Sequence, residues 1–186
     1  LDTGLYRNLT HDEHDPASLG DDRVMTLFHD SKGNLWVGSM AGGLDVRYAG
    51  ADGFVHFGHD PEDPASLSAN GVTAITEGTD GTIWVGTYRG GLNRLLADGK
   101  SFQRYNHDPD NPDGLGADQI MSLHPGDNGR IWIGTKAAGL NCLDPDTGTV
   151  THSRRGPDGP ESLGGARGWT GRVEAEGTLG WGGRGG

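Results

Sequence analysis

Short apolar stretches alternate with polar, glycine-containing turns along the chain, and the same order of stretches returns every 48 residues. The spacing is kept by a tryptophan, at Trp36, Trp84 and Trp132, and by the glycine three residues before it, at Gly33, Gly81 and Gly129. Gly177 continues the glycine series. A period between about 20 and 50 residues is typical of arrays in which each unit buries its apolar face against its neighbours. The pattern therefore predicts a repeat protein.

Within a unit, the apolar residues fall into four segments that predict β-strands, at 23–29, 35–39, 44–48 and 53–57 in the first unit. These segments are rich in β-branched and aromatic residues. The turns "DSKG", "GTDG" and "GDNG" after the first segment supply the positive φ angles that a tight hairpin needs. No stretch keeps a helical apolar period for more than about two turns. Four antiparallel strands in one unit is the pattern of a β-propeller blade.

The sequence therefore predicts an all-β fold, residues 1–186 forming a fragment of one β-propeller with four-stranded antiparallel blades. We expect units near 5–52, 53–100 and 101–148 and a degraded partial unit at 149–186, which is about three full blades plus terminal fragments. The segment "GLYRNLT" is expected to be a fourth strand of a preceding unit. In the tail, the expected first and second strands are predicted to be lost, because glycines replace apolar strand residues at Gly168, Gly171 and Gly180.

An incomplete ring is expected to behave as an open arc. A propeller closes with about four to eight blades. The outermost faces of an arc expose apolar edges that pair with other chains. We therefore expect marginal stability or self-association.

Composition narrows the possible partners. The 186 residues include 35 glycines and carry a formal net charge of −11, which argues against binding to a phosphate backbone and hence against a nucleic-acid partner. Cys142, the single cysteine, cannot form an internal disulfide and is interpreted as a small strand residue. Neither a membrane-length apolar run nor a signal segment is present, and the start without methionine indicates a piece of a longer protein.

The repeated pattern resembles the two-component regulator propeller repeat, found in sensor domains of bacterial hybrid histidine kinases and of some diguanylate cyclase receptors. The resemblance is carried by "GNLWVGSMAGGL" at 33–44, "GTIWVGTYRGGL" at 81–92 and "GRIWIGTKAAGL" at 129–140. The third unit departs from it, with Ala138 in place of the first glycine of the pair. The resemblance implies a non-catalytic, ligand-sensing propeller on the periplasmic or extracytoplasmic side of a membrane-anchored receptor. Its expected partners are the remaining blades and signalling domains of the parent chain.

Residues that recur in every unit are interpreted as structural. The tryptophans are expected to pack one blade on the next, because a large ring buries much apolar area. The glycine pairs are expected to let the chain turn sharply. The segments of "HDP..P.SL" type contain repeated histidines that are interpreted as parts of capping loops rather than metal ligands, at His11, His59 and His107. Neither a metal nor a cofactor is expected.

Function is expected where the units differ inside this constant frame. Between the second and third strands the units have "SMAGG", "TYRGG" and "TKAAG", so the variable residues are Met40, Tyr88, Arg89 and Lys136. In a propeller this turn and the proline-bearing connection are expected on one face, where loops on a rigid scaffold usually bind ligands. Tyr88 and Arg89 are expected to stack on and hydrogen-bond to a small polar ligand such as an oligosaccharide.

Two alternatives stay open, a propeller enzyme of glycoside-hydrolase or lyase type and a protein-interaction scaffold. The "D..G..W" hairpin also resembles the Asp-box of sialidase-like and xyloglucan-cleaving glycoside hydrolases, but most units lack the Ser or Thr two positions before the Asp. Glycoside hydrolysis needs two acids facing one cleft, and no unit is expected to bury an acid that the others lack. The sequence contains no Gly-x-Ser-x-Gly elbow and offers no plausible Ser, His, Asp set, so no catalytic residue is assigned.

Overall fold

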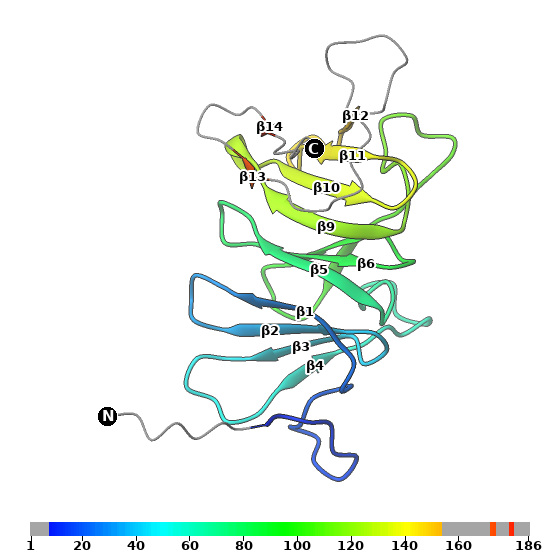
Figure 1. Cartoon of the computed structure of the whole chain (residues 1–186). Helices are drawn as coiled ribbons and strands as arrows, with labels where there is room; N and C mark the ends of the chain where they lie inside the picture. Colours follow the sequence, from blue (N-terminus) through cyan, green and yellow to red (C-terminus); the bar gives the residue numbers. More distant parts are fainter. Residues whose placement is uncertain (1–7, 154–171, 174–178, 181–186) are drawn as a thin grey trace, which may run out of the picture.

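The computed structural model describes residues 8–153, 172–173 and 179–180, and within them three four-stranded antiparallel sheets stack in chain order (Figure 1). Blade 1 contains β1 (Val24–His29), β2 (Leu35–Ser39), β3 (Leu44–Arg47) and β4 (Val55–Phe57). Blade 2 contains β5 (Val72–Glu77), β6 (Ile83–Thr87), β7 (Leu92–Leu95) and β8 (Phe102–Tyr105). Blade 3 contains β9 (Ile120–Pro125), β10 (Ile131–Thr135), β11 (Leu140–Leu143) and β12 (Val150–Ser153). The predicted all-β fold is confirmed.

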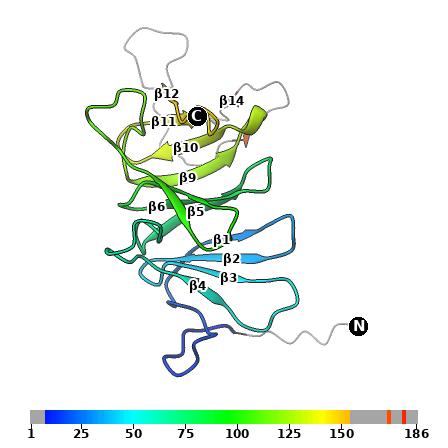
Figure 2. The ribbon, with the colours of Figure 1, turned by 180° about the vertical axis from the view of Figure 1, so that it is seen from behind.

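The blades stack through their first strands, because β1 packs against β5 and β5 against β9, an arrangement that both ribbon views show (Figure 2). The fourth strand of each blade forms the opposite edge of the sheet. The proline-bearing connection that enters a blade covers this edge with one backbone hydrogen bond, from Phe54 N–H to Ala17, from Phe102 N–H to Ala65 and from Val150 N–H to Asp113. This bond ties the start of the outer strand to the connection and leaves one fewer edge N–H group free to pair with another chain.

Two apolar clusters form the joints between blades. In the joint of blades 1 and 2, the buried Trp36 packs with Leu67, Val85 and Phe102 of the next blade. In the joint of blades 2 and 3, the buried Trp84 packs with residues of both blades, including Leu115 and Ile133. Each joint therefore uses a tryptophan from the second strand of one blade and an apolar face of the blade that follows.

The glycine that follows Trp-Val in the second strand is required by the same joints. A Cβ atom on Gly38 would overlap the side chain of Val72, and one on Gly86 would overlap that of Ile120. The first strand of the next blade thus lies directly over the glycine. A larger residue at either position would push the blades apart.

The third unit tolerates Ala138 because its neighbour is smaller. In blade 2, Gly90 faces Ser68 so closely that a Cβ on the glycine would clash. In blade 3, Ala138 faces Gly116 instead, and a Cβ on Gly116 would lie 2.8 Å from the Cβ of Ala138. In blade 2 the glycine is in the turn and the serine is in the connection, whereas in blade 3 the alanine is in the turn and the glycine is in the connection. Blade 3 also contains a three-residue 3-10 turn, Asp127–Gly129, which the sequence pattern did not predict.

The tail retains part of a blade hairpin. The short strands β13 (Arg172–Val173) and β14 (Leu179–Gly180) pair antiparallel, with Val173 opposite Leu179. This is the register of Pro125 opposite Ile131, 48 residues earlier. The prediction that both strands are lost is wrong for these residues, because ladder hydrogen bonds come from the backbone and a glycine supplies them too.

The other predictions for the ends fall largely outside the described residues. Gly168, Gly171 and Gly177 belong to this group, as do residues 1–7 of the expected N-terminal strand, whose residues 8–10 form no strand. In the part of the chain that the structure describes, no helix is long and apolar enough to cross a membrane.

Candidate functional site

The variable turn residues occupy equivalent places in the three blades, directly after β2, β6 and β10. Their backbone N–H groups donate to carbonyls just ahead of β1, β5 and β9, at 2.8–3.0 Å, from Met40 to Arg23, from Tyr88 to Gly71 and from Lys136 to Gln119. Each turn therefore lies against the end of the proline-bearing connection, and the two segments share one face of the blade. We call the row formed by Met40, Tyr88, Arg89 and Lys136 the rim.

Three of the four rim residues come together across the joint of blades 2 and 3. Lys136 Nζ donates a hydrogen bond to the Tyr88 hydroxyl oxygen at 2.8 Å and lies 5.2 Å from the centre of the Tyr88 ring. The Arg89 guanidinium lies 5.9 Å from the same ring centre. Met40 is exposed, and a Cβ atom on Gly71 would lie 3.4 Å from its carbonyl oxygen and 3.6 Å from the Tyr88 Cβ, so the Met40 turn borders Tyr88 across the joint of blades 1 and 2.

The rim carries two cationic side chains, Arg89 and Lys136, on a chain of net charge −11. Within the described residues, neither Arg89 nor Lys136 forms an ion pair with a carboxylate. The hydrogen bond and the charge of Lys136 lower the pKa of Tyr88 from its ordinary value. Since Lys136 donates to the phenolic oxygen, the Tyr88 O–H remains available as a donor. An aromatic face with hydrogen-bond donors on two sides can stack on a sugar ring and bind its oxygens.

The repeated histidines hold the proline-bearing connections closed. Their Nδ1 atoms lie 2.6–2.8 Å from the carbonyl oxygen eight residues later, in the pairs His11 and Leu19, His59 and Leu67, and His107 and Leu115. No cluster of three or more His, Cys, Asp or Glu residues with metal-binding geometry occurs among the described residues. Cys142 is buried in β11, and burial raises the pKa of its thiol, which keeps it in the unreactive protonated form.

Blade 1 buries two acids that the other blades lack, so the prediction that no unit does so is wrong. Asp45 is fully buried where the other units have Asn93 and Asn141, and Asp30 is buried where they have Gly78 and Gly126. The substitutions are visible in the sequence. The burial of Asp45 is not, because β3 is covered on both faces and the polar partners Gly20 and His56 come from other segments.

Asp45 ties the outer strand of blade 1 to the connection. Its Oδ1 lies 2.7 Å from His56 Nδ1, and its Oδ2 accepts the Gly20 N–H at 2.9 Å. His56 Nε2 lies 2.9 Å from the Pro16 carbonyl oxygen. Burial opposes the charged ring, but the bonds to Asp45 and Pro16 outweigh it and raise the pKa of His56. Both ring nitrogens then donate, which fits a structural rather than a catalytic role.

Asp30 is equally engaged by its own blade. Its Oδ2 accepts hydrogen bonds from Trp36 Nε1 at 2.8 Å and from Asn34 Nδ2 at 2.9 Å. Burial acts to raise the pKa of Asp30, yet the bonds from Trp36, Asn34 and Lys32 lower it overall. The carboxylate therefore fixes the indole ring in the joint.

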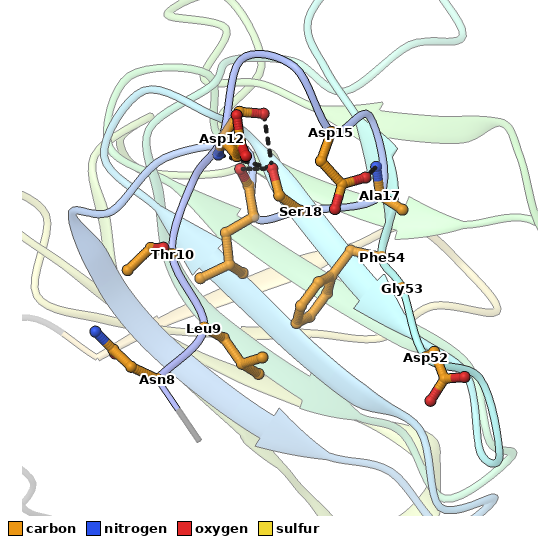
Figure 3. Close-up of a pocket in the computed structure, with 11 residues that line it drawn as sticks. Asn8, Leu9, Thr10, Asp12, Asp15, Ala17, Ser18, Asp52, Gly53 and Phe54 are labelled. Carbon is orange, nitrogen blue, oxygen red and sulfur yellow. Dashed lines mark hydrogen bonds between the residues drawn. The ribbon is translucent and has the colours of Figure 1, made fainter. Parts of the chain in front are cut away.

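A cavity of about 390 Å³ opens on the face of blade 1 turned away from blade 2, where the side chains of Leu9 and Phe54 border it (Figure 3). It is lined by Asn8, Leu9, Thr10, Asp12, Asp15, Ala17, Ser18, Leu19, Asp52, Gly53 and Phe54. Asp12 and Asp15 already accept backbone N–H groups of their own loop. The cavity was not predicted from the sequence. The 48-residue spacing between Leu9 and Phe57 of the outer strand β4 could have indicated it, because it places Leu9 at an outer-strand repeat position beside blade 1.

Residues 18–41, 66–89 and 114–137 match the two component regulator propeller family. No curated protein matches the chain. The chain is similar to the extracellular domain of a putative hybrid two component system from B. thetaiotaomicron, at 23% identity and TM-score 0.67, over 80% of this chain and 20% of that one. It is also similar to the extracellular domain of a putative one component system from the same organism, at 20% identity and TM-score 0.61, over 87% and 22%.

A third solved structure, virginiamycin B lyase from Staphylococcus aureus, is similar at 22% identity and TM-score 0.54, over 74% of this chain and 42% of the lyase. Similarities at these identities show a shared fold. The chain spans about a fifth of the length of the two extracellular domains.

Proposed function

Since the chain carries three repeats of the two component regulator propeller family, we propose that it is a non-catalytic, ligand-sensing module of a bacterial membrane-anchored receptor. The receptor type is a two-component histidine kinase or a diguanylate cyclase, and the module lies on the extracytoplasmic side of the membrane. The shared fold with extracellular domains of putative one- and two-component systems supports this placement.

The rim is the proposed binding site, and the contact between Lys136 and Tyr88 is the observation that carries it. The two residues vary among units whose surrounding residues stay constant, and they join neighbouring blades. The proposed ligand is a small polar molecule, an oligosaccharide in particular, which stacks on the Tyr88 ring and bonds to Arg89 and Lys136. A ligand that replaces the bond between Lys136 and Tyr88 changes the contact between two blades, which is a physical route for passing a signal.

Calorimetric titration with a panel of neutral and acidic oligosaccharides tests this proposal. The double variant Tyr88→Ala/Arg89→Ala is expected to lose the binding that the unmodified chain shows, with an unchanged melting temperature. Tyr48→Ala is the matched control, because Tyr48 is an exposed tyrosine that follows β3 at the opposite end of the blade. Equal affinity of the double variant and the unmodified chain contradicts the rim as the site, and absence of binding across the panel contradicts the oligosaccharide.

A propeller enzyme of glycoside-hydrolase or lyase type is the alternative, and the fold shared with virginiamycin B lyase supports it. Against it, the repeated histidines and the two buried acids of blade 1 are engaged in structural hydrogen bonds. Chromatography of the same panel after incubation with the protein separates the two functions. Cleaved products that require an intact rim contradict the sensor and support the enzyme.

A further inference from the structure

The chain contains two Asn-Gly steps, and the fold holds them differently. Asn70 stands just ahead of β5, and Asn128 lies in the turn between β9 and β10. Both asparagines are exposed, so access of water does not distinguish them. An asparagine before glycine is open to attack on its side-chain amide, because glycine has no Cβ atom to shield its own backbone nitrogen.

The fold fixes Asn70 on both sides of its peptide bond. Its Oδ1 accepts the His59 N–H at 2.7 Å, and its carbonyl oxygen accepts the Gly43 N–H at 3.1 Å. Beyond the peptide bond, the Gly71 carbonyl oxygen accepts the Tyr88 N–H at 2.8 Å. Attack of Gly71 on the Asn70 side chain therefore requires that side chain to leave His59 and the peptide unit to turn away from Gly43.

Asn128 lacks such a restraint on its side chain. At the same repeat position in blade 2, Asp80 accepts the Thr82 N–H at 3.0 Å and the Thr82 hydroxyl at 2.8 Å. Within residues 8–153, the Asn128 side chain has no hydrogen-bond partner. Asn128 is also the one described non-glycine residue with a positive φ, at φ 57° and ψ 34°, a conformation that few residues other than glycine adopt. The turn thus presents an unbound amide next to an unshielded glycine nitrogen.

We propose that Asn128 is a site of spontaneous deamidation, with Gly129 as the attacking residue. The Gly129 nitrogen forms a bond to Asn128 Cγ, and the side-chain nitrogen leaves as ammonia with the proton that Gly129 gives up. Water then opens the resulting cyclic imide at either carbonyl and leaves an aspartate or an isoaspartate. The reaction consumes water from the solvent, releases ammonia and adds a negative charge. This inference is independent of the ligand at the rim, because the turn lies at the opposite end of β10 from Lys136.

The two products fit the turn differently. The aspartate has a partner in Arg130, two residues on, since Asp21 binds Arg23 at the same spacing with bonds of 3.0 and 3.1 Å. The isoaspartate routes the backbone through the side chain and so lengthens the turn. That turn joins two strands whose register places Pro125 opposite Ile131. The isoaspartate is therefore expected to lower the melting temperature more than the aspartate does.

Peptide mapping by mass spectrometry tests the proposal on the unmodified chain, incubated in mildly alkaline buffer. Trypsin places Asn70 and Asn128 in separate peptides, because Arg89 and Arg104 lie between them. The Asn128 peptide is expected to gain the deamidated mass severalfold faster than the Asn70 peptide, and isoaspartyl methyltransferase is expected to label it. Asn128→Gln is expected to abolish this labelling, since the longer side chain closes the imide ring far more slowly.

The same incubation in guanidinium chloride is the matched control, because it removes the fold and leaves two Asn-Gly steps of similar sequence. There the two rates are expected to converge. Equal rates in the folded protein would overturn the proposal, since the bonds to His59 and Gly43 then offer no protection. It is also wrong if Asn128 stays intact in the folded protein while both asparagines convert in guanidinium chloride.

Discussion

Removal of the indole ring of Trp84 is expected to cost a large part of the stability of this chain. Trp84 is 2% exposed and packs in the joint of blades 2 and 3. The Tyr105 ring centre lies 5.8 Å from the Trp84 ring centre, and the Arg94 guanidinium carbon lies 5.5 Å from it. Truncation of a buried tryptophan to alanine costs about 3–5 kcal/mol. The aromatic pair and the cation–π contact each account for about 1 kcal/mol of that loss.

Such a loss is comparable with the whole free energy of unfolding of a small domain, about 5–15 kcal/mol. Urea denaturation measures this loss of unfolding free energy. Circular dichroism is the suitable signal, because the mutation removes a tryptophan and so changes the fluorescence. Trp84→Phe keeps an aromatic ring and is expected to lose less, whereas the exposed Tyr48→Ala is expected to stay within about 0.5 kcal/mol of the unmodified chain. A loss for Trp84→Ala no larger than that of Tyr48→Ala would refute the claim that the joints hold the blades together.

Three further predictions follow from single contacts. Gly38→Ala is expected to lower the free energy of unfolding in urea by about 1–3 kcal/mol, because the added Cβ overlaps the Val72 side chain. Gly58→Ala is the control, because the nearest atom to its added Cβ, Asn70 Oδ1, lies 3.8 Å away. Equal losses for the two variants would contradict the close approach of the blades at Gly38. The pKa of His56 is raised above 6.5 in the folded protein, so its stabilising bond to Asp45 is complete below about pH 6.5 and is lost as the pH rises through the raised pKa. His56→Gln is expected to flatten this part of the stability–pH profile, and an unchanged profile would count against the pair. Lys136→Gln is expected to raise the pKa of Tyr88 toward its ordinary value in an ultraviolet titration, more than Arg89→Gln does; the reverse order would argue against the bond between Lys136 and Tyr88.

The strands could be predicted because three units repeat the same sequence pattern in fixed register. Ambiguity in one copy, such as the short β4, is resolved by β8 and β12 at the same repeat positions. The glycines of the second strands were harder to explain from sequence. Their role depends on the strand of the next blade, which a pattern within one unit does not reveal.

The candidate site was predicted as four positions but not as a contact. Variation among units identified Tyr88 and Lys136, which are 48 residues apart. That the lysine reaches across a joint to the tyrosine depends on the stacking of two blades. The ion pair of Asp45 and His56 escaped prediction for a related reason, since a buried aspartate and a solvated one have the same place in the strand pattern.

One paired measurement tests most directly whether each blade depends on the blade before it. Leu27→Asp and Ile75→Asp make the same change at the same repeat position, on an open face and in a closed joint. Urea denaturation is expected to place Leu27→Asp within about 0.5 kcal/mol of the unmodified chain. Ile75→Asp is expected to lose about 3 kcal/mol or more, because it buries a charge without a partner. Equal losses for the two variants would contradict the account.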